Sequence, residues 1–388
     1  MKKKKSLPAL PYAILGFRIE NYDGIKSTEI SGLPNNAKWI FLTGENGYGK
    51  TTVLQAVARA IRGLFHWLDE SPSDKMNVQT TLKFKEKQQI VNFKLFTDEA
   101  TGLFWMESFP IFAYGSSRLN ISPTENDKSL ANPIASLFDS KIVLRNIEFQ
   151  LSRWHFKQDD LEFKTKFDSV CRVLKQLLPI REIRVDFKTD KVTYIEKDPE
   201  NKSYEPVEFR QLASGFKSII ALVGDMILRL FEAQPNIYDP AELEGIVLID
   251  ELDLHFHPNI QRELPRMLSE VFPKIQFIAT THSPIPILGA PEGSVFLTVR
   301  RNKEEGITVH RINLDVSDLT PNLILTSSIF GFDNIFAETF HESQRIRTED
   351  TLAEKSLNDQ VMERLKSFAA SDPDVFERVF KEKPGAAR

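Results

Sequence analysis

A glycine-rich segment in the first part of the chain carries residue types that bind phosphate groups. The segment fits the pattern GxxxxGK[ST] in full, and with the next threonine it comprises Gly44, Glu45, Asn46, Gly47, Tyr48, Gly49, Lys50, Thr51 and Thr52. Glycines let backbone N–H groups curve around phosphate oxygens, and a helix starting here adds a positive dipole. Lys50 is expected to reach the β- and γ-phosphates, and the Thr51 hydroxyl to bind Mg²⁺. This segment, the phosphate loop, predicts a nucleoside triphosphate site.

Two acidic residues follow an apolar run in the second half of the chain. The run is Ile246 to Ile249, and Asp250 and Glu251 come directly after it. If the run is a buried strand, both carboxylates lie at its carboxyl end, where α/β sheets bind ligands. Asp250 is expected to hold Mg²⁺, directly or through water, and Glu251 to polarise the attacking water. Such a pair can also serve only as a helix cap; the phosphate loop favours the functional interpretation.

A histidine follows the next apolar run, in the segment Thr281-His282-Ser283. A neutral imidazole there could hydrogen-bond the γ-phosphate or the attacking water. A lone histidine after a strand is commonly incidental, so this assignment depends on its place after the acidic pair.

The segment Gln211–Lys217 contains a Ser-Gly pair just before an apolar helix. Ser214 and Gly215 suit an ordinary helix N-cap, and they also suit an anion site. They lie too far along the chain to serve the same phosphates in the same pocket as Lys50.

Two histidines, His255 and His257, lie just after the acidic pair and allow two interpretations. They could bind a transition metal as a pair, or they could belong to the first turn of a helix, which the following Pro258 favours.

Hydrophobic patterning predicts the elements that position these residues. Continuous apolar runs indicate strands buried on both faces; they cover 39–43, 110–114, 246–249 and 275–280. Helical spacing predicts helices; they cover 51–65, 214–233 and 259–272. Strands that alternate with helices indicate a parallel α/β sheet. Further strands, within 12–33 and 81–97 and in a closing hairpin at 295–309, make the sheet mixed.

The composition is ordinary for a soluble globular protein, with 41% hydrophobic and 27% charged residues. A net charge of −4 means that any nucleic-acid contact would be a local patch. The single cysteine, Cys171, excludes an internal disulfide, and its apolar flanks predict a buried helix face. No apolar run approaches the roughly 18 residues of a membrane span, and the lysines at 2–5 lack a following apolar stretch. We expect a cytoplasmic protein without membrane contact.

The phosphate loop, the Ser-Gly pair, the acidic pair and the histidine occur in the order found in ABC ATPases, and the chain resembles that family. It is most similar to the branch related to RecF, the SMC proteins and the ATPase part of OLD-family nucleases, over about 12–65, 110–118 and 205–300. The resemblance implies an α/β P-loop NTPase of the ABC/SMC-head type, with a mixed central sheet flanked by helices and a mainly helical insertion. It implies ATP and Mg²⁺ as cofactors, with Thr51 and Asp250 at the metal.

The resemblance further implies that two heads sandwich two ATP molecules. Ser214, Gly215 and Lys217 would then meet the γ-phosphate bound by the partner chain, and Asp253 would lie in the loop that communicates between the two sites. Glu251 and His282 would be catalytic. Two departures stand out: Ala213 occupies a place where family signatures often carry a serine, and no Mg²⁺-sensing glutamine is evident. The segment Tyr114–Arg118 is the candidate for that last role.

Four parts are expected along the chain. Residues 1–119 form the N-terminal part of the ATPase head, 120–208 a helical insertion with a charged hairpin, 209–312 the C-terminal part of the head, and 313–388 a partner-docking region. The insertion lacks sustained heptads, which argues against a long coiled coil. The scattered acids after 341 and the aromatic run 330–340 predict partner docking and no nuclease chemistry.

Three hypotheses for the role of the head follow. The first is a prokaryotic anti-phage ATPase, because the compact head resembles those of Septu- and PARIS-type systems, where the ATPase controls a separate effector such as a nuclease. The second is a RecF-like DNA-binding ATPase of repair or replication, whose activity DNA would stimulate. The third is a scaffold with a structural ATP site, which the presence of Glu251 disfavours. The chain is expected to assemble with itself, as an ATP-sandwich dimer or a higher oligomer.

Overall fold

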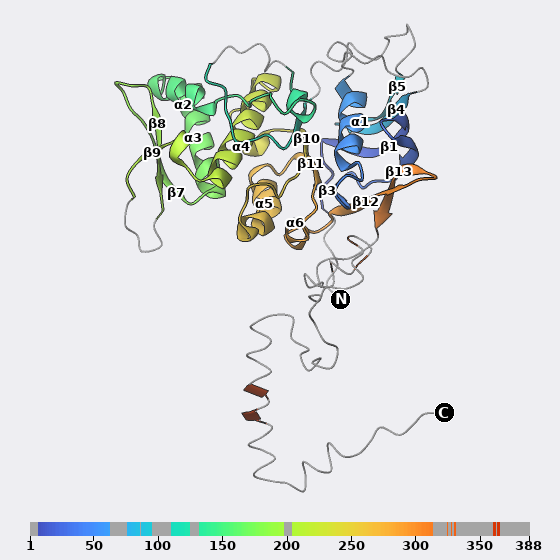
Figure 1. Ribbon diagram of the computed structural model, residues 1–388. Coiled ribbons are helices and arrows are strands. Elements are labelled where there is room, and N and C mark those ends of the chain that lie inside the picture. Colours follow the sequence, from blue (N-terminus) through green and yellow to red (C-terminus); the bar gives the residue numbers. More distant parts are fainter. Residues whose placement is uncertain are drawn as a thin grey trace. The chain divides into compact units, whose positions relative to one another are not determined.

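The computed structural model describes residues 7–62, 76–85, 87–94, 110–124, 132–197 and 204–312, and a few positions beyond them. The chain divides into two compact units, Met1–Gly331 and Phe332–Arg388. All the elements below lie in the first unit (Figure 1). The predicted docking region 313–388 and its aromatic run lie almost entirely outside the described residues, and the four predicted parts remain a prediction.

A ten-stranded sheet forms the centre of the first unit (Figure 1), in the order β5-β4-β1-β2-β13-β12-β3-β11-β10-β6. Its strands are β1 (Tyr12–Tyr22), β2 (Ile25–Ile30), β3 (Trp39–Thr43), β4 (Asn77–Phe84), β5 (Lys87–Lys94), β6 (Ile111–Tyr114), β10 (Gly245–Ile249), β11 (Ile275–Thr280), β12 (Val295–Asn302) and β13 (Gly306–Ile312). The five strands from β12 to β6 run parallel to one another. The remaining pairs are antiparallel. The predicted mixed sheet is confirmed.

Strands β3, β10 and β11 are buried along their whole length, which explains why apolar residues dominate their sequences. Successive side chains of a strand point to opposite faces, and β3 shows the consequence. Trp39 and Phe41 belong to one hydrophobic core, whereas Ile40 and Leu42 belong to the other. Trp39 stacks on Phe277 of the neighbouring strand with ring centroids 4.7 Å apart.

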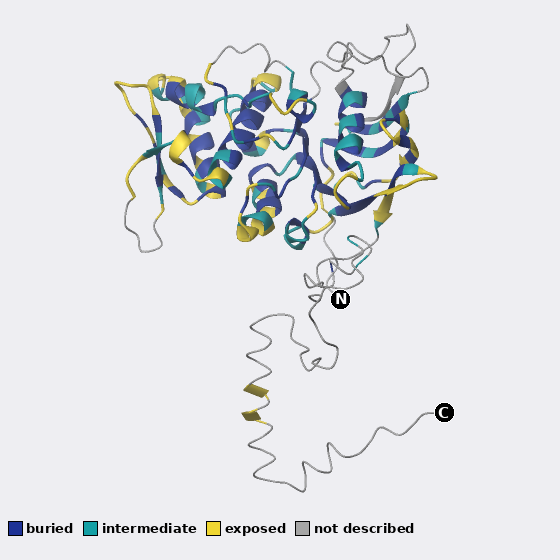
Figure 2. Cartoon of the chain, in the orientation of Figure 1, coloured by how far each residue is buried: buried dark blue, intermediate teal, exposed yellow. Residues whose placement is uncertain are grey.

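Helices cover both faces of this sheet. They are α1 (Lys50–Arg62), α2 (Ile147–Phe156), α3 (Leu161–Leu177), α4 (Ser214–Ala233), α5 (Pro258–Val271) and the short α6 (Ile285–Leu288). Helix α1 packs in the core of Ile40 and Leu42, and α2 to α5 pack in the core of Trp39. Every residue of α4 from Ser218 to Phe231 is buried (Figure 2), as expected for a helix that is apolar on all sides.

Helices α2 and α3 form a lobe with a second, antiparallel sheet of β7 (Ile180–Val185), β8 (Val192–Glu196) and β9 (Val207–Glu208). The sequence predicted a hairpin over 181–208, and the structure adds the third, two-residue strand to it. Cys171 is buried on α3, as predicted, and burial raises the pKa of its thiol to about 12. Helices able to cross a membrane, by length and apolar composition together, are absent from the described residues.

The start of α5 decides between the two interpretations of His255 and His257. His257 is the N-cap residue, and its Nδ1 accepts a hydrogen bond from the Asn259 backbone N–H at 3.3 Å. Pro258 occupies the first helical position, where its missing N–H has no consequence. His257 therefore begins a helix, as the proline indicated.

Candidate active site

The phosphate loop joins the end of β3 to the start of α1, as the sequence predicted. Gly47 and Gly49 have φ values of 78° and 94°, a left-handed conformation that glycine adopts without strain. A Cβ atom built on Gly47 would meet nothing within 4 Å, so the tip of the loop is open. Glu45, Asn46 and Gly47 are exposed, whereas Lys50 beneath them is buried. The loop therefore forms an open cradle over a buried amine.

The Lys50 amine is held inside this cradle. Its Nζ donates hydrogen bonds to the backbone oxygens of Gly44 and Glu45, at 2.8 and 3.0 Å. Burial lowers the pKa of Lys50, while the carboxylates at 250, 251 and 253 oppose that shift. The amine consequently lies among loop carbonyls on one side and acidic groups on the other.

Asp250 links the phosphate loop to two strands of the sheet. Its Oδ2 accepts a hydrogen bond from the Thr51 hydroxyl at 2.8 Å, and its Oδ1 accepts one from the Thr280 hydroxyl at 2.6 Å. The side chain is buried, with 5% exposure. The sequence predicted the pair Thr51–Asp250 but not Thr280, which is simply the last residue of an apolar strand.

These donors fit a magnesium ion. A hydroxyl and a carboxylate oxygen are hard ligands of the kind that Mg²⁺ takes, and Mg²⁺ keeps several waters beside one or two protein ligands. Within the described residues, no group of three or more histidine, cysteine and acidic side chains could hold a metal by itself. The ion would therefore take Thr51 and Asp250 from the protein and its other ligands from phosphate oxygens and water.

Glu251 has an unusual backbone that is held from two sides. Its φ is 49°, in the left-handed region that non-glycine residues rarely occupy. Its N–H donates to the Thr280 hydroxyl at 2.7 Å, and its carbonyl accepts from Nη2 of Arg118 at 2.7 Å. Strained conformations of this kind cluster at active sites and persist only where the surroundings fix them. Within the described part of the chain, the Glu251 carboxylate itself accepts no hydrogen bond, so it is available to a water molecule.

Arg118 is a buried positioning residue, with 1% exposure. Its Nη1 donates to the carbonyls of Gly115, at 2.9 Å, and Asp250, and its Nη2 donates to that of Glu251. Burial lowers its pKa to about 10, while nearby carboxylates, Asp250 first, oppose the shift. The sequence proposed the segment Tyr114–Arg118 as a magnesium sensor; the structure places Arg118 of this segment against the backbone of the acidic pair.

Replacing Arg118 by methionine is expected to lower the free energy of unfolding by about 3 kcal/mol, because three carbonyl oxygens lose a buried charged donor. Chemical denaturation measures this change. The matched control is Arg266→Met, which removes an exposed arginine that pairs with Glu263 and Glu270 on α5. The control is expected to cost less than about 1 kcal/mol. Equal losses in the two variants would contradict the positioning role of Arg118.

The structure brings His282 and Asp253 together. The imidazole Nε2 lies 3.5 Å from Oδ2 of Asp253, and the Thr281 hydroxyl donates to Oδ1 of Asp253 at 2.6 Å. Asp253 is buried at 5% exposure, and His282 is 42% exposed. The histidine predicted to sense the γ-phosphate thus lies next to the residue predicted to communicate between sites.

The Ser-Gly pair begins α4, as predicted. Ser214 is exposed, and a Cβ built on Gly215 would meet only the carbonyl oxygen of His255, at 3.2 Å, and the ring of Phe256. The N-cap residue Ala213 supplies no side-chain hydrogen bond. The N–H groups of this first turn are therefore left for another acceptor.

Asp225 ties α4 to strand β6, the strand that precedes Arg118 in the chain. It is fully buried and accepts hydrogen bonds from the Tyr114 hydroxyl at 2.8 Å and from Nε of Arg229 at 2.6 Å. Tyr114 ends β6, four residues before Arg118. A buried pair of this kind fixes geometry, because breaking it leaves an uncompensated charge. These contacts therefore fix the position of α4, which begins with the Ser-Gly pair, relative to the acidic pair after β10.

Comparison with known proteins begins with a family model. The model described as an AAA domain, putative AbiEii toxin, Type IV TA system, matches residues 103–285. The match covers the acidic pair, the Ser-Gly pair and His282, but it is shorter than half of the chain and does not include the phosphate loop.

Two curated proteins and one solved structure also match. The Septu protein PtuA of Bacillus mycoides is 29% identical over 332 residues, 81% of this chain and 44% of that protein. The Retron Ec83 probable ATPase of Escherichia coli is 50% identical over 74 residues, 19% of this chain and 14% of that protein. The chain therefore spans less than half the length of both relatives. An SMC head domain from Thermotoga maritima aligns with 78% of this chain and 99% of that chain, at 14% identity and a TM-score of 0.44, too weak a likeness to carry weight.

Proposed function

We propose that this chain, a P-loop ATPase of the ABC type related to the Septu and retron proteins, hydrolyses ATP between two copies of itself and controls a separate effector in anti-phage defence. One observation supports the proposal of ATP hydrolysis. The carboxylate of Asp250 accepts hydrogen bonds from the hydroxyls of Thr51, in the phosphate loop, and of Thr280. Lys50 lies in the same loop, and the next residue, Glu251, offers an unengaged carboxylate. Cation, metal ligands and base are thus assembled at one edge of the sheet.

The side chains divide the work of phosphoryl transfer. Lys50 and the loop N–H groups bind the β- and γ-phosphates. Magnesium, when bound at Thr51 and Asp250, neutralises charge on those phosphates. The Glu251 carboxylate orients water and accepts its proton. We expect His282, whose Nε2 lies 3.5 Å from Oδ2 of Asp253, to donate a hydrogen bond to the γ-phosphate.

The dimer follows from the start of α4. The N–H groups at the start of α4 suit a phosphate; Ser214 is exposed, and a Cβ on Gly215 would meet only His255 and Phe256. An anion at this helix end would therefore come from a second chain, with Lys217 adding positive charge. Because a two-fold dimer repeats each contact, two ATP molecules would be enclosed.

Mixing two inactive variants tests this arrangement. Gly215→Glu places a carboxylate against the partner's γ-phosphate, and Lys50→Ala disables the chain's own loop. In a heterodimer, one composite site lacks both defects and the other carries both. With random pairing and independent sites, about a quarter of wild-type ATPase activity should return on mixing.

The control is Gly215→Ala, which adds the Cβ without the charge and should stay active alone. Absence of any recovery, with heterodimers verified by a mass-tagged chain, would place catalysis within a single chain and contradict the proposed sandwich.

The defence role is supported by the Septu and retron matches: the Septu protein aligns with 81% of this chain, and the retron ATPase is 50% identical over 19% of it. We infer that ATP-dependent closure of the two heads changes the affinity of the chain for an effector protein. A nuclease is the expected class of effector. Purification of the chain with the product of an adjacent gene, followed by ATP addition, tests the coupling. A complex unaffected by ATP and by Glu251→Gln would contradict it.

A further inference from the structure

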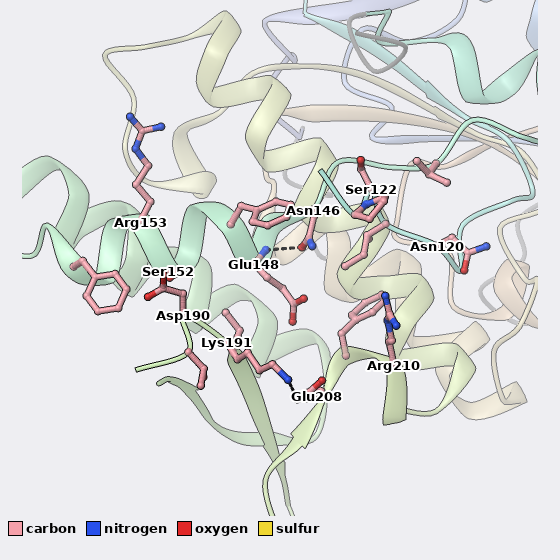
Figure 3. Close-up of a pocket in the computed structure, with 18 residues that line it drawn as sticks. Asn120, Ser122, Asn146, Glu148, Ser152, Arg153, Asp190, Lys191, Glu208 and Arg210 are labelled. Carbon is pink, nitrogen blue, oxygen red and sulfur yellow. Dashed lines mark hydrogen bonds and ion pairs between the residues drawn. The ribbon is translucent and has the colours of Figure 1, made fainter. Parts of the chain in front are cut away.

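A cleft of about 1020 Å³ opens in the helical lobe, among residues that the ATP site does not use (Figure 3). Its walls are the loop 120–123, helix α2, the turn before β8, and the segment Glu208–Arg210. A space of this size can accommodate a peptide segment of several residues.

Apolar and aromatic side chains make part of the lining, including Phe149, Phe156 and Phe209. Phe156 is 42% exposed and contacts Phe187, which is 76% exposed, with ring centroids 5.4 Å apart. These two rings extend the apolar lining onto the surface. Exposed aromatic rings beside a cleft favour contact with another macromolecule.

Glu148 supplies the polar group of the cleft. Figure 3 shows its carboxylate in the open space between the Lys191–Glu208 pair and Asn146. It accepts a hydrogen bond from the Tyr194 hydroxyl at 3.2 Å. Within the described residues it has no ion-pair partner, because Lys191 is engaged by Glu208 at 2.6 Å. A partly buried carboxylate that lacks an ion-pair partner favours the binding of a cationic group.

We propose that this cleft binds a partner protein through a segment that presents an arginine or lysine beside apolar residues, with Glu148 accepting its charged group. The lining carries as many acids as cations, so it lacks the excess of positive charge that a nucleic-acid backbone requires; the acids are Glu148, Asp190 and Glu208 and the cations are Arg153, Lys191 and Arg210. The chain's own lysines at 2–5 form an unbroken charged run with no apolar residue between them. A partner segment that joins both features fits best.

The cleft is connected to the ATP site through its walls. The loop 120–123 starts two residues after Arg118, whose guanidinium holds the backbone of Asp250 and Glu251. The opposite wall ends at Arg210, four residues before Ser214. An occupant that moves either wall would therefore act on the geometry that the proposed function requires. The docking proposal itself does not depend on hydrolysis.

Fluorescence anisotropy without ATP tests the docking. The probes are fluorescein-labelled Leu-Arg-Phe-Leu amide and its neutral twin, in which citrulline replaces arginine. The wild-type chain should bind the arginine peptide at least about tenfold more tightly than the twin. In Glu148→Gln the two affinities should agree to within about twofold, because the amide offers no charge. The control Glu182→Gln, an exposed carboxylate of the same lobe outside the cleft, should behave as wild type.

The pH dependence gives a second readout. Burial raises the pKa of Glu148 to about 7, with Tyr194 and Asn146 opposing the shift and Glu208 adding to it. Lys191, Asp190, Arg153 and Arg210 are the other charged groups of the lining. Because only the carboxylate attracts the cation, arginine-peptide affinity should rise about tenfold from pH 6 to pH 8, and that of the twin should stay flat.

Several outcomes would overturn the docking proposal. Equal binding of the two peptides by the wild-type chain, binding of neither, or a preference that survives in Glu148→Gln would each do so. Displacement of the probe by a peptide of residues 1–7, or by single-stranded DNA, at lower concentration than by unlabelled arginine peptide would assign the cleft to that occupant. None of these results bears on ATP hydrolysis, so failure here is separable from failure of the proposed function.

Discussion

Glutamine in place of Glu251 is expected to stop ATP turnover while Mg²⁺ and ATP still bind. The amide keeps the shape of the side chain and the strained backbone at φ 49° but cannot accept a proton from water. General-base catalysis contributes about 10²- to 10⁴-fold to a rate, so kcat should fall by that factor. ATP affinity should change little, because Lys50, Thr51 and Asp250 are untouched.

A consequence of arrested turnover is that the ATP-bound dimer accumulates. Light scattering after gel filtration should show the Glu251→Gln chain as a dimer with ATP and Mg²⁺, and as a smaller species with ADP. The control Glu263→Gln changes an exposed glutamate on α5 that pairs with Arg266, and it should hydrolyse ATP and fail to accumulate the dimer. A Glu251→Gln chain that stays in the same state with both nucleotides would contradict the sandwich.

Alanine in place of Lys50 is expected to weaken ATP binding by at least about 100-fold. The variant removes a buried cation and its charge-assisted hydrogen bonds to phosphate, each contributing about 1.5–3 kcal/mol. It also leaves the negative charges of Asp250, Asp253 and Glu251, which face Lys50 in the folded chain, without that cation. Both effects act against a bound triphosphate. Titration with a fluorescent ATP analogue measures the change.

The matched control for this variant is Lys38→Ala. Lys38 is also partly buried, and burial lowers its pKa, but its Nζ contacts the backbone oxygen of Ser269 at 3.5 Å, away from the phosphate loop. Its loss should leave ATP affinity at the wild-type value. If Lys50→Ala bound ATP with the wild-type affinity, the assignment of the phosphate loop to the nucleotide site would be contradicted.

The parallel part of the fold could be predicted because its signals are local. Strand β3 coincides with the predicted apolar run Trp39–Thr43, and β11 with Ile275–Thr280. Each is buried along its whole length, so apolar residues dominate its sequence. The order of the motifs also identified the relationship to Septu-type and related ATPases, which the matches confirm.

The contacts that arrange the site could not be predicted in the same way. Arg118 and Thr280 reach the acidic pair only because β6 and β11 flank β10 in the sheet. The order of strands in a sheet cannot be deduced from the local sequence of any one strand. The backbone of Glu251, with its positive φ, is held by a hydrogen bond that Arg118 donates to its carbonyl and by one that its own N–H donates to the Thr280 hydroxyl. The cleft at Glu148 likewise joins segments from four parts of the chain. Long-range pairing decides all three features.

Phosphate release by the purified wild-type chain, measured beside Glu251→Gln, tests the central claim most directly. With ATP and Mg²⁺, the wild-type chain should release phosphate, and its rate per chain should rise with protein concentration, because two chains complete each site. Chelation of Mg²⁺ should abolish the release, and Glu251→Gln should release phosphate at least about 100-fold more slowly. Equal rates from the two chains, or none from wild type across the concentrations at which it dimerises, would contradict an ATPase built on Glu251.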